Sequence, residues 1–136
     1  MTETLIKTEE DMLAFGAELA RQVQAPCVIC LAGDLGAGKT TLVRGFLREL
    51  GYQGTVKSPT YNIVESYELN DMTIHHFDLY RLRDAEELEM MGFLDYFADN
   101  CICLIEWPEI AQHYLKQADI YCTIEVCGDA RKIISA

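Results

Sequence analysis

Residues 33–40 read Gly33-Asp34-Leu35-Gly36-Ala37-Gly38-Lys39-Thr40, a complete G-x-x-x-x-G-K-T phosphate-binding loop. The apolar run 28–32 before it has the length of a strand, and apolar residues after it recur at the helical spacing i, i+3, i+4 and i+7 from Val43. Because the motif binds phosphate where a strand passes into a helix, these flanks support it. A glycine-rich turn that merely joins strand to helix would explain the glycines but not the Lys39-Thr40 pair.

The loop predicts a nucleotide site. Glycine lets the backbone curl around an anion, so that N–H groups and the positive end of the helix dipole converge on the β-phosphate. Lys39 would reach the β- and γ-phosphates, and the Thr40 hydroxyl would bind Mg²⁺. We therefore expect ATP and Mg²⁺ at this loop, with contacts from Gly33, Asp34, Leu35, Gly36, Ala37, Gly38, Lys39 and Thr40.

The composition favours one small acidic domain over residues 1–136, long enough for a single sizeable core. The chain has 22 acidic and 11 basic residues, and its formal net charge of −11 repels phosphate backbones, so extensive direct binding of nucleic acid is disfavoured. No stretch approaches the roughly 18 apolar residues of a membrane span, and the N-terminus lacks the basic start of a signal peptide. A cytoplasmic protein away from membranes is expected.

The remaining periodicities predict an α/β fold. Capping residues 8–11 open an amphipathic helix that runs to about residue 24, and Gly51 ends the helix after the loop. Two hairpins imply a mixed sheet with antiparallel edges, so we predict a P-loop NTPase-like three-layer sandwich with a mixed, mostly parallel central sheet. Strands are expected at 61–69, 73–80, 101–105, 120–126 and 133–135, and short helices at 84–92 and from Pro108.

The cysteine pairs resemble redox or metal motifs only superficially. Cys27 and Cys30 fall in a strand and, three residues apart, would point to opposite faces. Cys101 and Cys103 would share a face, but a central strand would bury it. We expect all four to be reduced core residues.

A P-loop enzyme also needs a carboxylate at the end of a second buried strand, where it can hold the Mg²⁺ shell or polarise water. Glu106 follows the apolar run 102–105 and fits this position, although it could be simply the first solvated residue after a strand. Asp78, which shares a strand face with His76, is a second candidate and could equally be a surface carboxylate. Thr60 has the hydroxyl and loop position of a switch residue that senses the γ-phosphate and Mg²⁺, or of a plain turn residue.

Other polar residues are less informative. Arg81 and Arg83 could counter phosphate charge, but in so acidic a stretch pairing with neighbouring carboxylates is expected. Trp107 is either a packing residue at the edge of the sheet or a platform near the nucleotide. No histidine has the spacing of a metal cage, so any divalent metal should arrive with the nucleotide. Surface or core roles are expected for His75, His76 and His113.

Four motifs in register resemble those of the bacterial TsaE (YjeE) family, over roughly residues 8–135. The resemblance implies a Mg²⁺-dependent ATPase required for the threonylcarbamoyladenosine modification at position 37 of tRNAs that read ANN codons. It also implies that this ATPase acts with the TsaB and TsaD proteins. The motifs are Gly33 to Thr41, Ser58-Pro-Thr-Tyr-Asn62, His76-Phe-Asp-Leu-Tyr-Arg81 and Ile105-Glu-Trp-Pro-Glu109.

The same resemblance implies roles for single residues. Thr41 and Trp107 would lie at the nucleotide, and Thr60 would belong to a switch-like loop. The implied catalytic residues are Lys39, Asp78 and Glu106, and the implied metal-site residues are Thr40, Thr60, Asp78 and Glu106.

Partners and alternatives follow from the same features. A domain this small, without an evident arginine finger, should hydrolyse ATP slowly, be stimulated by partners, and exist alone as a monomer. The partner proteins would handle most of the tRNA. A small-molecule or nucleotide kinase would share the loop, but it needs an acceptor pocket and usually an arginine-rich lid. A non-catalytic assembly factor, whose bound nucleotide sets its affinity for partners, is the other alternative.

Overall fold

The computed structural model describes residues 1–59, 61–115 and 118–136. They build one mixed seven-stranded sheet in the order β1-β7-β6-β2-β5-β4-β3. The strands are β1 (Thr2–Ile6), β2 (Cys27–Gly33), β3 (Val64–Leu69), β4 (Met72–Asp78), β5 (Cys101–Glu106), β6 (Ile120–Cys127) and β7 (Ala130–Ser135). The helices are α1 (Glu9–Gln22), α2 (Lys39–Glu49), α3 (Glu86–Met90) and the 3₁₀ turns η1 (Phe93–Tyr96) and η2 (Pro108–Ala111).

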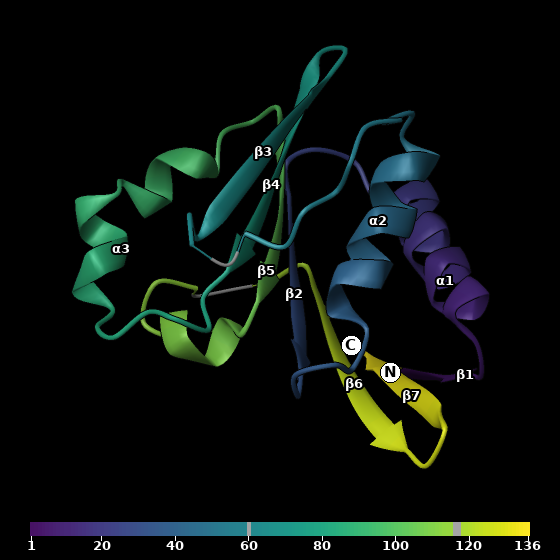
Figure 1. Ribbon diagram of the computed structural model, residues 1–136. Coiled ribbons are helices and arrows are strands. Elements are labelled where there is room, and N and C mark those ends of the chain that lie inside the picture. Colours follow the sequence, from purple (N-terminus) through teal and green to yellow (C-terminus); the bar gives the residue numbers. More distant parts are fainter. Residues whose placement is uncertain (60, 116–117) are drawn as a thin grey trace.

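The sheet lies between two helical layers, with α1 and α2 on one face and α3 on the other (Figure 1). The four central strands, β6, β2, β5 and β4, pair in parallel. The hairpins β3–β4 and β6–β7 and the pairing of β1 with β7 are antiparallel. This confirms the predicted α/β sandwich and its mixed sheet. Across the described residues, every helix lacks the length and apolar character needed to cross a bilayer.

The sequence pattern misses one strand and extends another. Strand β1 is not predicted, because this edge strand buries only Ile6 and has no apolar run. It pairs with β7, where Leu5 lies opposite Lys132. The predicted strand 61–69 begins only at Val64, because Ile63 has a left-handed backbone with φ of 67°.

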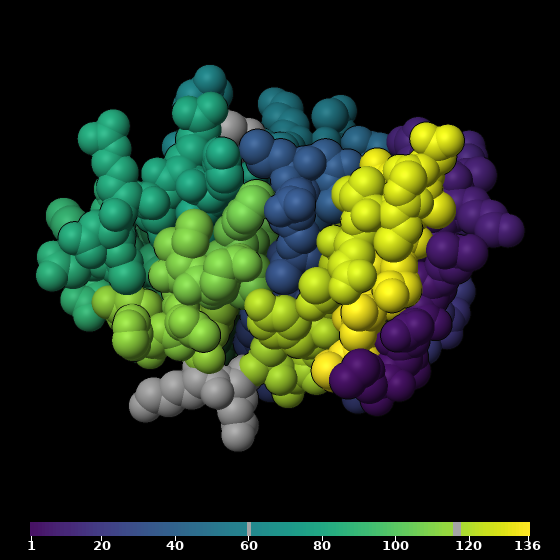
Figure 2. All heavy atoms as spheres, turned by 90° about the horizontal axis from the view of Figure 1, so that it is seen from below, coloured from purple at the N-terminus to yellow at the C-terminus, as the bar shows by residue number. Residues whose placement is uncertain are grey.

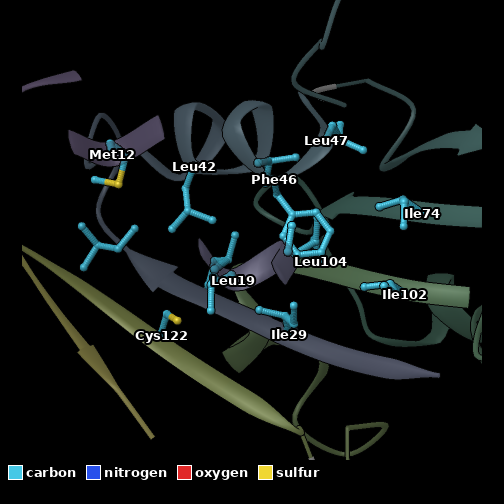
Figure 3. Close-up of a cluster of buried hydrophobic side chains, with 14 of the residues drawn as sticks. Met12, Leu19, Ile29, Leu42, Phe46, Leu47, Ile74, Ile102, Leu104 and Cys122 are labelled. Atoms are coloured by element: carbon cyan, nitrogen blue, oxygen red, sulfur yellow. The ribbon is translucent and has the colours of Figure 1, made fainter. Parts of the chain in front are cut away.

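Helices α1 and α2 cover an apolar core on the sheet (Figure 3). Leu19 of α1 and Phe46 of α2 belong to one buried cluster with Ile29 of β2 and Leu104 of β5. This face is the one on which the phosphate loop passes into α2, so the core holds the start of that helix against the ends of the strands.

Two glycines allow α1 and α2 to approach closely. A Cβ atom on Gly16 would lie 2.0 Å from the carbonyl oxygen of Leu42, and one on Gly45 would lie 2.1 Å from that of Leu13. Backbone oxygens cannot yield as a flexible side chain can, so the helices can keep this distance only with glycine at both positions.

The cysteines behave as core residues. Burial raises the pKa of Cys27 to about 11 and that of Cys30 to about 12, because the thiolate would lose its hydration. All four residues of the Cys-x-x-Cys and Cys-x-Cys pairs are buried and free, which confirms the expectation that they serve the core. The buried free cysteines are Cys27, Cys30, Cys101, Cys103 and Cys122, and Cys127 is exposed.

The carboxyl ends of the parallel strands meet at one edge of the sheet. Strand β2 ends at Gly33, and Glu106 at the end of β5 lies opposite Leu31 of β2 and Asp78 of β4. In the view from below, the blue atoms around the phosphate loop lie between the green atoms that follow β5 and the yellow hairpin β6–β7 (Figure 2). Topology alone therefore brings the loop and both candidate carboxylates together.

We expect Gly45→Ala to lower the free energy of unfolding by at least about 1–3 kcal/mol, the usual cost of forcing extra volume into a packed contact. Urea unfolding followed by circular dichroism measures the change. Arg48→Ala, at an exposed position of the same helix, is the matched control and should shift stability by less than about 0.5 kcal/mol. An unchanged midpoint for Gly45→Ala would show that the helix pair can accommodate a methyl group.

Candidate functional site

The phosphate loop has a backbone that only glycine adopts readily at two positions. Gly36 and Gly38 have φ values of 80° and 109°, and a Cβ on Gly38 would lie 2.8 Å from the Cε of Met12. Gly38 is also the N-cap of α2, and no side chain in the described ranges caps this helix. The first N–H groups of α2 and the positive end of its dipole are therefore available to an anion.

Lys39 is the first residue of α2 and is only 5% exposed. Its ammonium donates to the Gly33 carbonyl and lies 3.8 Å from the centre of the Trp107 ring, a cation–π contact. Burial lowers the pKa of Lys39, and the negative charges of Glu106 and Asp78 partly oppose this shift. The fold thus holds a cation beside the loop, where a polyphosphate would gain most from it.

Glu106 ends β5 and is only 3% exposed. Its Oε2 accepts a hydrogen bond from Thr40 Oγ1 at 3.3 Å and lies 2.5 Å from Nε2 of His76. The prediction placed Glu106 at the end of a buried strand, and the structure adds that it directly contacts the threonine of the loop. A hydroxyl and a carboxylate side by side are the oxygen donors that Mg²⁺ prefers.

Asp78 lies beside Glu106 in the parallel register of β4 and β5. Its Oδ1 accepts from the Tyr80 N–H at 3.1 Å, and its Oδ2 accepts from Ser58 Oγ at 3.4 Å. Burial raises the pKa of Asp78; the charge of Glu106 adds to this shift, while the Tyr80 N–H opposes it. Asp78 is therefore an oriented carboxylate with more basic character than an exposed aspartate.

A cavity of about 280 Å³ unites these groups. The structure brings together the predicted residues of the loop, both carboxylates and Trp107, whereas the prediction for Thr60 falls outside the described residues. Gly33 and Asp34 shape the loop through their backbone, since the Asp34 carbonyl accepts from the Ala37 N–H at 3.1 Å. The cavity is lined by Leu35, Gly36, Gly38, Lys39, Thr40, Thr41, Ser58, Asp78, Glu106 and Trp107.

A second cavity of about 240 Å³ lies along the same loop. It shares Gly36, Gly38 and Thr41 with the first cavity and adds Ala37 of the loop. Sequence reasoning missed its other walls, because they come from the end of β1, the start of α1 and the β6–β7 hairpin, which is far from both in the chain. These walls are Ile6, Lys7, Thr8, Glu9, Met12, Asp129 and Arg131, and Arg131 Nη2 donates to the Gly36 carbonyl at 3.4 Å.

The sequence predicted the surroundings of Trp107 and His76 only in part. Trp107 has a left-handed backbone with φ of 58°, and its ring packs on Tyr80 with centroids 4.9 Å apart while it covers Lys39. His76 was assigned a surface or core role; it is buried, which fits the core role, and its ring contacts Glu106. The only signal in the sequence was that His76 shares a strand face with Asp78.

The metal chemistry of the site depends on few protein donors. Within the described residues, no three His, Cys, Asp or Glu side chains gather into a metal cage. Thr40 and Glu106 nevertheless fit Mg²⁺, because this ion usually takes one or two protein oxygens and completes its shell with phosphates and water.

The chain is similar to known proteins over most of its length. The family model for the threonylcarbamoyl adenosine biosynthesis protein TsaE matches residues 6–133. A Haemophilus influenzae protein named tRNA threonylcarbamoyladenosine biosynthesis protein TsaE is 51% identical over 133 residues, covering 94% of this chain and 84% of that protein. The Bacillus subtilis protein of the same name is 38% identical over 108 residues, covering 79% of this chain and 67% of that protein.

A solved structure agrees with the fold. The crystal structure of YdiB from Bacillus subtilis superposes with a TM-score of 0.83 at 28% identity, covering 99% of this chain and 84% of that one.

We expect Asp78→Asn to stabilise the nucleotide-free protein at pH 7. Because the pKa of Asp78 is raised, the folded state favours the protonated carboxyl. The stability that the protonated carboxyl contributes is present below the ordinary aspartate pKa, and it is lost as the pH rises through the pKa of Asp78 in the folded state. The gain in Tm should therefore be largest near neutral pH and vanish below about pH 4.

Thermal unfolding across this pH range, in the presence of a chelator, measures the effect. Asp71→Asn, in the exposed turn between β3 and β4, is the control and should show no such pH-dependent difference. A variant less stable than the unsubstituted protein at pH 7 would contradict the expected cost of ionised Asp78.

Proposed function

The chain belongs to the TsaE family, and from this premise we propose that it binds and hydrolyses ATP in the threonylcarbamoyladenosine modification of tRNA. The family gives the role in tRNA modification. The ATP, the Mg²⁺, the residue roles and the partners are inferred from the site and from the resemblance of its motifs.

The meeting of Lys39, Thr40 and Glu106 at the start of α2 is the observation that carries the ATPase proposal. A buried ammonium, a hydroxyl and a carboxylate converge on a glycine loop, and no side chain of the described residues caps the start of the helix that follows it. Backbone N–H groups and Lys39 would bind the phosphates, and Thr40 and Glu106 would hold Mg²⁺. When bound, the ion would neutralise charge on the β- and γ-phosphate oxygens.

Asp78 is the residue we propose for orienting the attacking water and accepting its proton. It lines the same cavity as Lys39 and Thr40, and burial raises its pKa toward the range of a useful general base. Hydrogen bonds from Ser58 and from the Tyr80 N–H fix both of its oxygens. We also propose that Thr60 acts with this group as a switch residue, as the family motif implies.

The second cavity is where we place the nucleoside. It continues from Gly36 and Thr41, so one ligand could lie along the loop with phosphates in one cavity and its base in the other. Thr8 and Glu9 at the start of α1 and Arg131 of β7 would then contact the nucleoside. Cavities of this combined size suit a nucleoside triphosphate better than phosphate alone.

The proposed setting is the cytoplasm, with the chain monomeric until it meets the TsaB and TsaD proteins. A net charge of −11 would repel tRNA, so we propose that the partners provide most of the tRNA surface. A kinase would need an acceptor for its phosphoryl group. Release of phosphate from ATP without any acceptor would therefore separate the ATPase from that alternative.

Lys39→Ala should weaken binding of ATP and ADP by about 10- to 100-fold, the usual loss for a charge-assisted hydrogen bond. The fold should persist, because Lys39 contacts the loop and Trp107 and does not belong to the apolar core cluster. Calorimetric titration with each nucleotide measures the effect. Lys132→Ala, on β7 and outside both cavities, is the lysine control. Equal affinity in both variants would remove the nucleotide site.

The TsaB and TsaD proteins should raise ATP turnover by this chain, by about 10³- to 10⁵-fold if they complete the site with a missing charge. Phosphate release from the mixture, with and without each partner, measures this. The Lys39→Ala variant should show no stimulation. Absence of both a complex and faster release, with ATP present, would leave nucleotide binding intact but contradict the proposed partnership.

A further inference from the structure

His76 is a buried imidazole at the floor of the site. Its side chain is 0% exposed, and Nε2 lies 2.5 Å from Glu106 Oε2. The other ring nitrogen, Nδ1, is buried without a hydrogen-bond partner in the part of the chain that the structure describes. The ring therefore makes one polar contact, and that contact is with the carboxylate beside Thr40.

The contact has a direction. An ionised carboxylate can only accept a hydrogen bond, so Nε2 must carry the hydrogen and donate it to Glu106. Nδ1 is then left without a partner among the described residues, which costs stability in a buried position. A leucine or phenylalanine would fill the same space without that cost. Packing alone therefore does not account for a histidine here, whereas its Nε2–H does.

The contacts of Glu106 show what the hydrogen bond from His76 does. Strand register alone places Glu106 beside Asp78, with which it would share like charge. The bond from His76 approaches from β4 on the same strand face and holds Oε2 within 3.3 Å of the Thr40 hydroxyl. Without it, the contact with Thr40 would be the one side-chain hydrogen bond left to Glu106 within the described residues.

We propose that His76 is a positioning residue that orients the Glu106 carboxylate toward Thr40 and so prepares the Mg²⁺ site for a bound nucleotide. This inference rests on the proposed function. Removing a residue that hydrogen-bonds to a metal ligand typically weakens the affinity for the metal by about 10- to 100-fold.

The test compares two histidines that follow one another on β4. His76→Leu removes the donor, and His76→Gln keeps an N–H near the position of Nε2. His75→Leu is the control, because that neighbour is on the opposite face and contacts Ser66 Oγ at 2.7 Å instead. Trp107, the only tryptophan of the chain, lies over Lys39 and can report nucleotide binding by fluorescence.

Each protein is titrated with Mg²⁺ at fixed ADP, and with ADP in chelator. We expect His76→Leu to raise the half-saturating Mg²⁺ concentration about 10- to 100-fold while ADP affinity in chelator changes less than about twofold. His76→Gln should stay within about threefold of the unsubstituted protein, and His75→Leu should match it.

Unchanged Mg²⁺ dependence in His76→Leu would overturn the proposal, and so would equal losses in His76→Leu and His76→Gln. If His76→Leu fails to fold, His76→Phe carries the same expectation with a ring of similar size. In a Glu106→Gln background, His76→Gln and His76→Leu should not differ in Mg²⁺ dependence, and a difference there would show that His76 acts by another route. If the unsubstituted protein binds ADP without any effect of Mg²⁺, the proposed metal site fails and this inference with it; otherwise only the role of His76 is at stake.

Discussion

A negative charge buried at the end of a strand is the constraint on which this site depends. Glu106 has almost no contact with water, and an ionised carboxylate in such a place is costly unless charge and hydrogen bonds compensate it. The compensation comes from three groups on two segments: the charge of Lys39 and the Thr40 hydroxyl at the start of α2, and the His76 imidazole of β4. The same groups that make the buried charge tolerable are those that a nucleotide with Mg²⁺ would use. The same small set of contacts therefore serves both the stability and the proposed function of the site.

Parallel pairing is what brings those contacts together. Strands β2, β5 and β4 run side by side in the same direction, so the loop after β2 and the last residues of β4 and β5 arrive at one edge. The helix pair holds the other side of this arrangement. Gly16 and Gly45 let α1 lie close against α2, and Met12 of α1 contacts the space above Gly38. A change in the spacing of α1 and α2 would therefore move Met12 relative to Gly38 of the phosphate loop.

Much of this could be predicted from the sequence, because the deciding features are local. The loop 33–40 has its own motif, and Glu106 follows an apolar run of strand length. The hairpins were predictable from alternation and turn residues. Other parts depend on pairings between distant segments, which periodicity does not show. Strand β1 has too few apolar residues to stand out, Arg131 reaches the loop from the last hairpin, and His76 meets Glu106 only because β4 lies next to β5.

The pairing of β1 with β7 has a consequence for the order in which the chain can mature. Among the strands of the described residues, β1 precedes all the others in the chain, yet its only strand partner, β7, follows them all. Thr2 lies opposite Ser135, so this border of the sheet stays open until β7 has been made. Contacts between such distant segments form late and slowly. The cavity between Thr8 and Arg131 exists only after β1 and β7 have paired. A ligand that binds in it therefore shifts the equilibrium toward the state in which the two strands are paired.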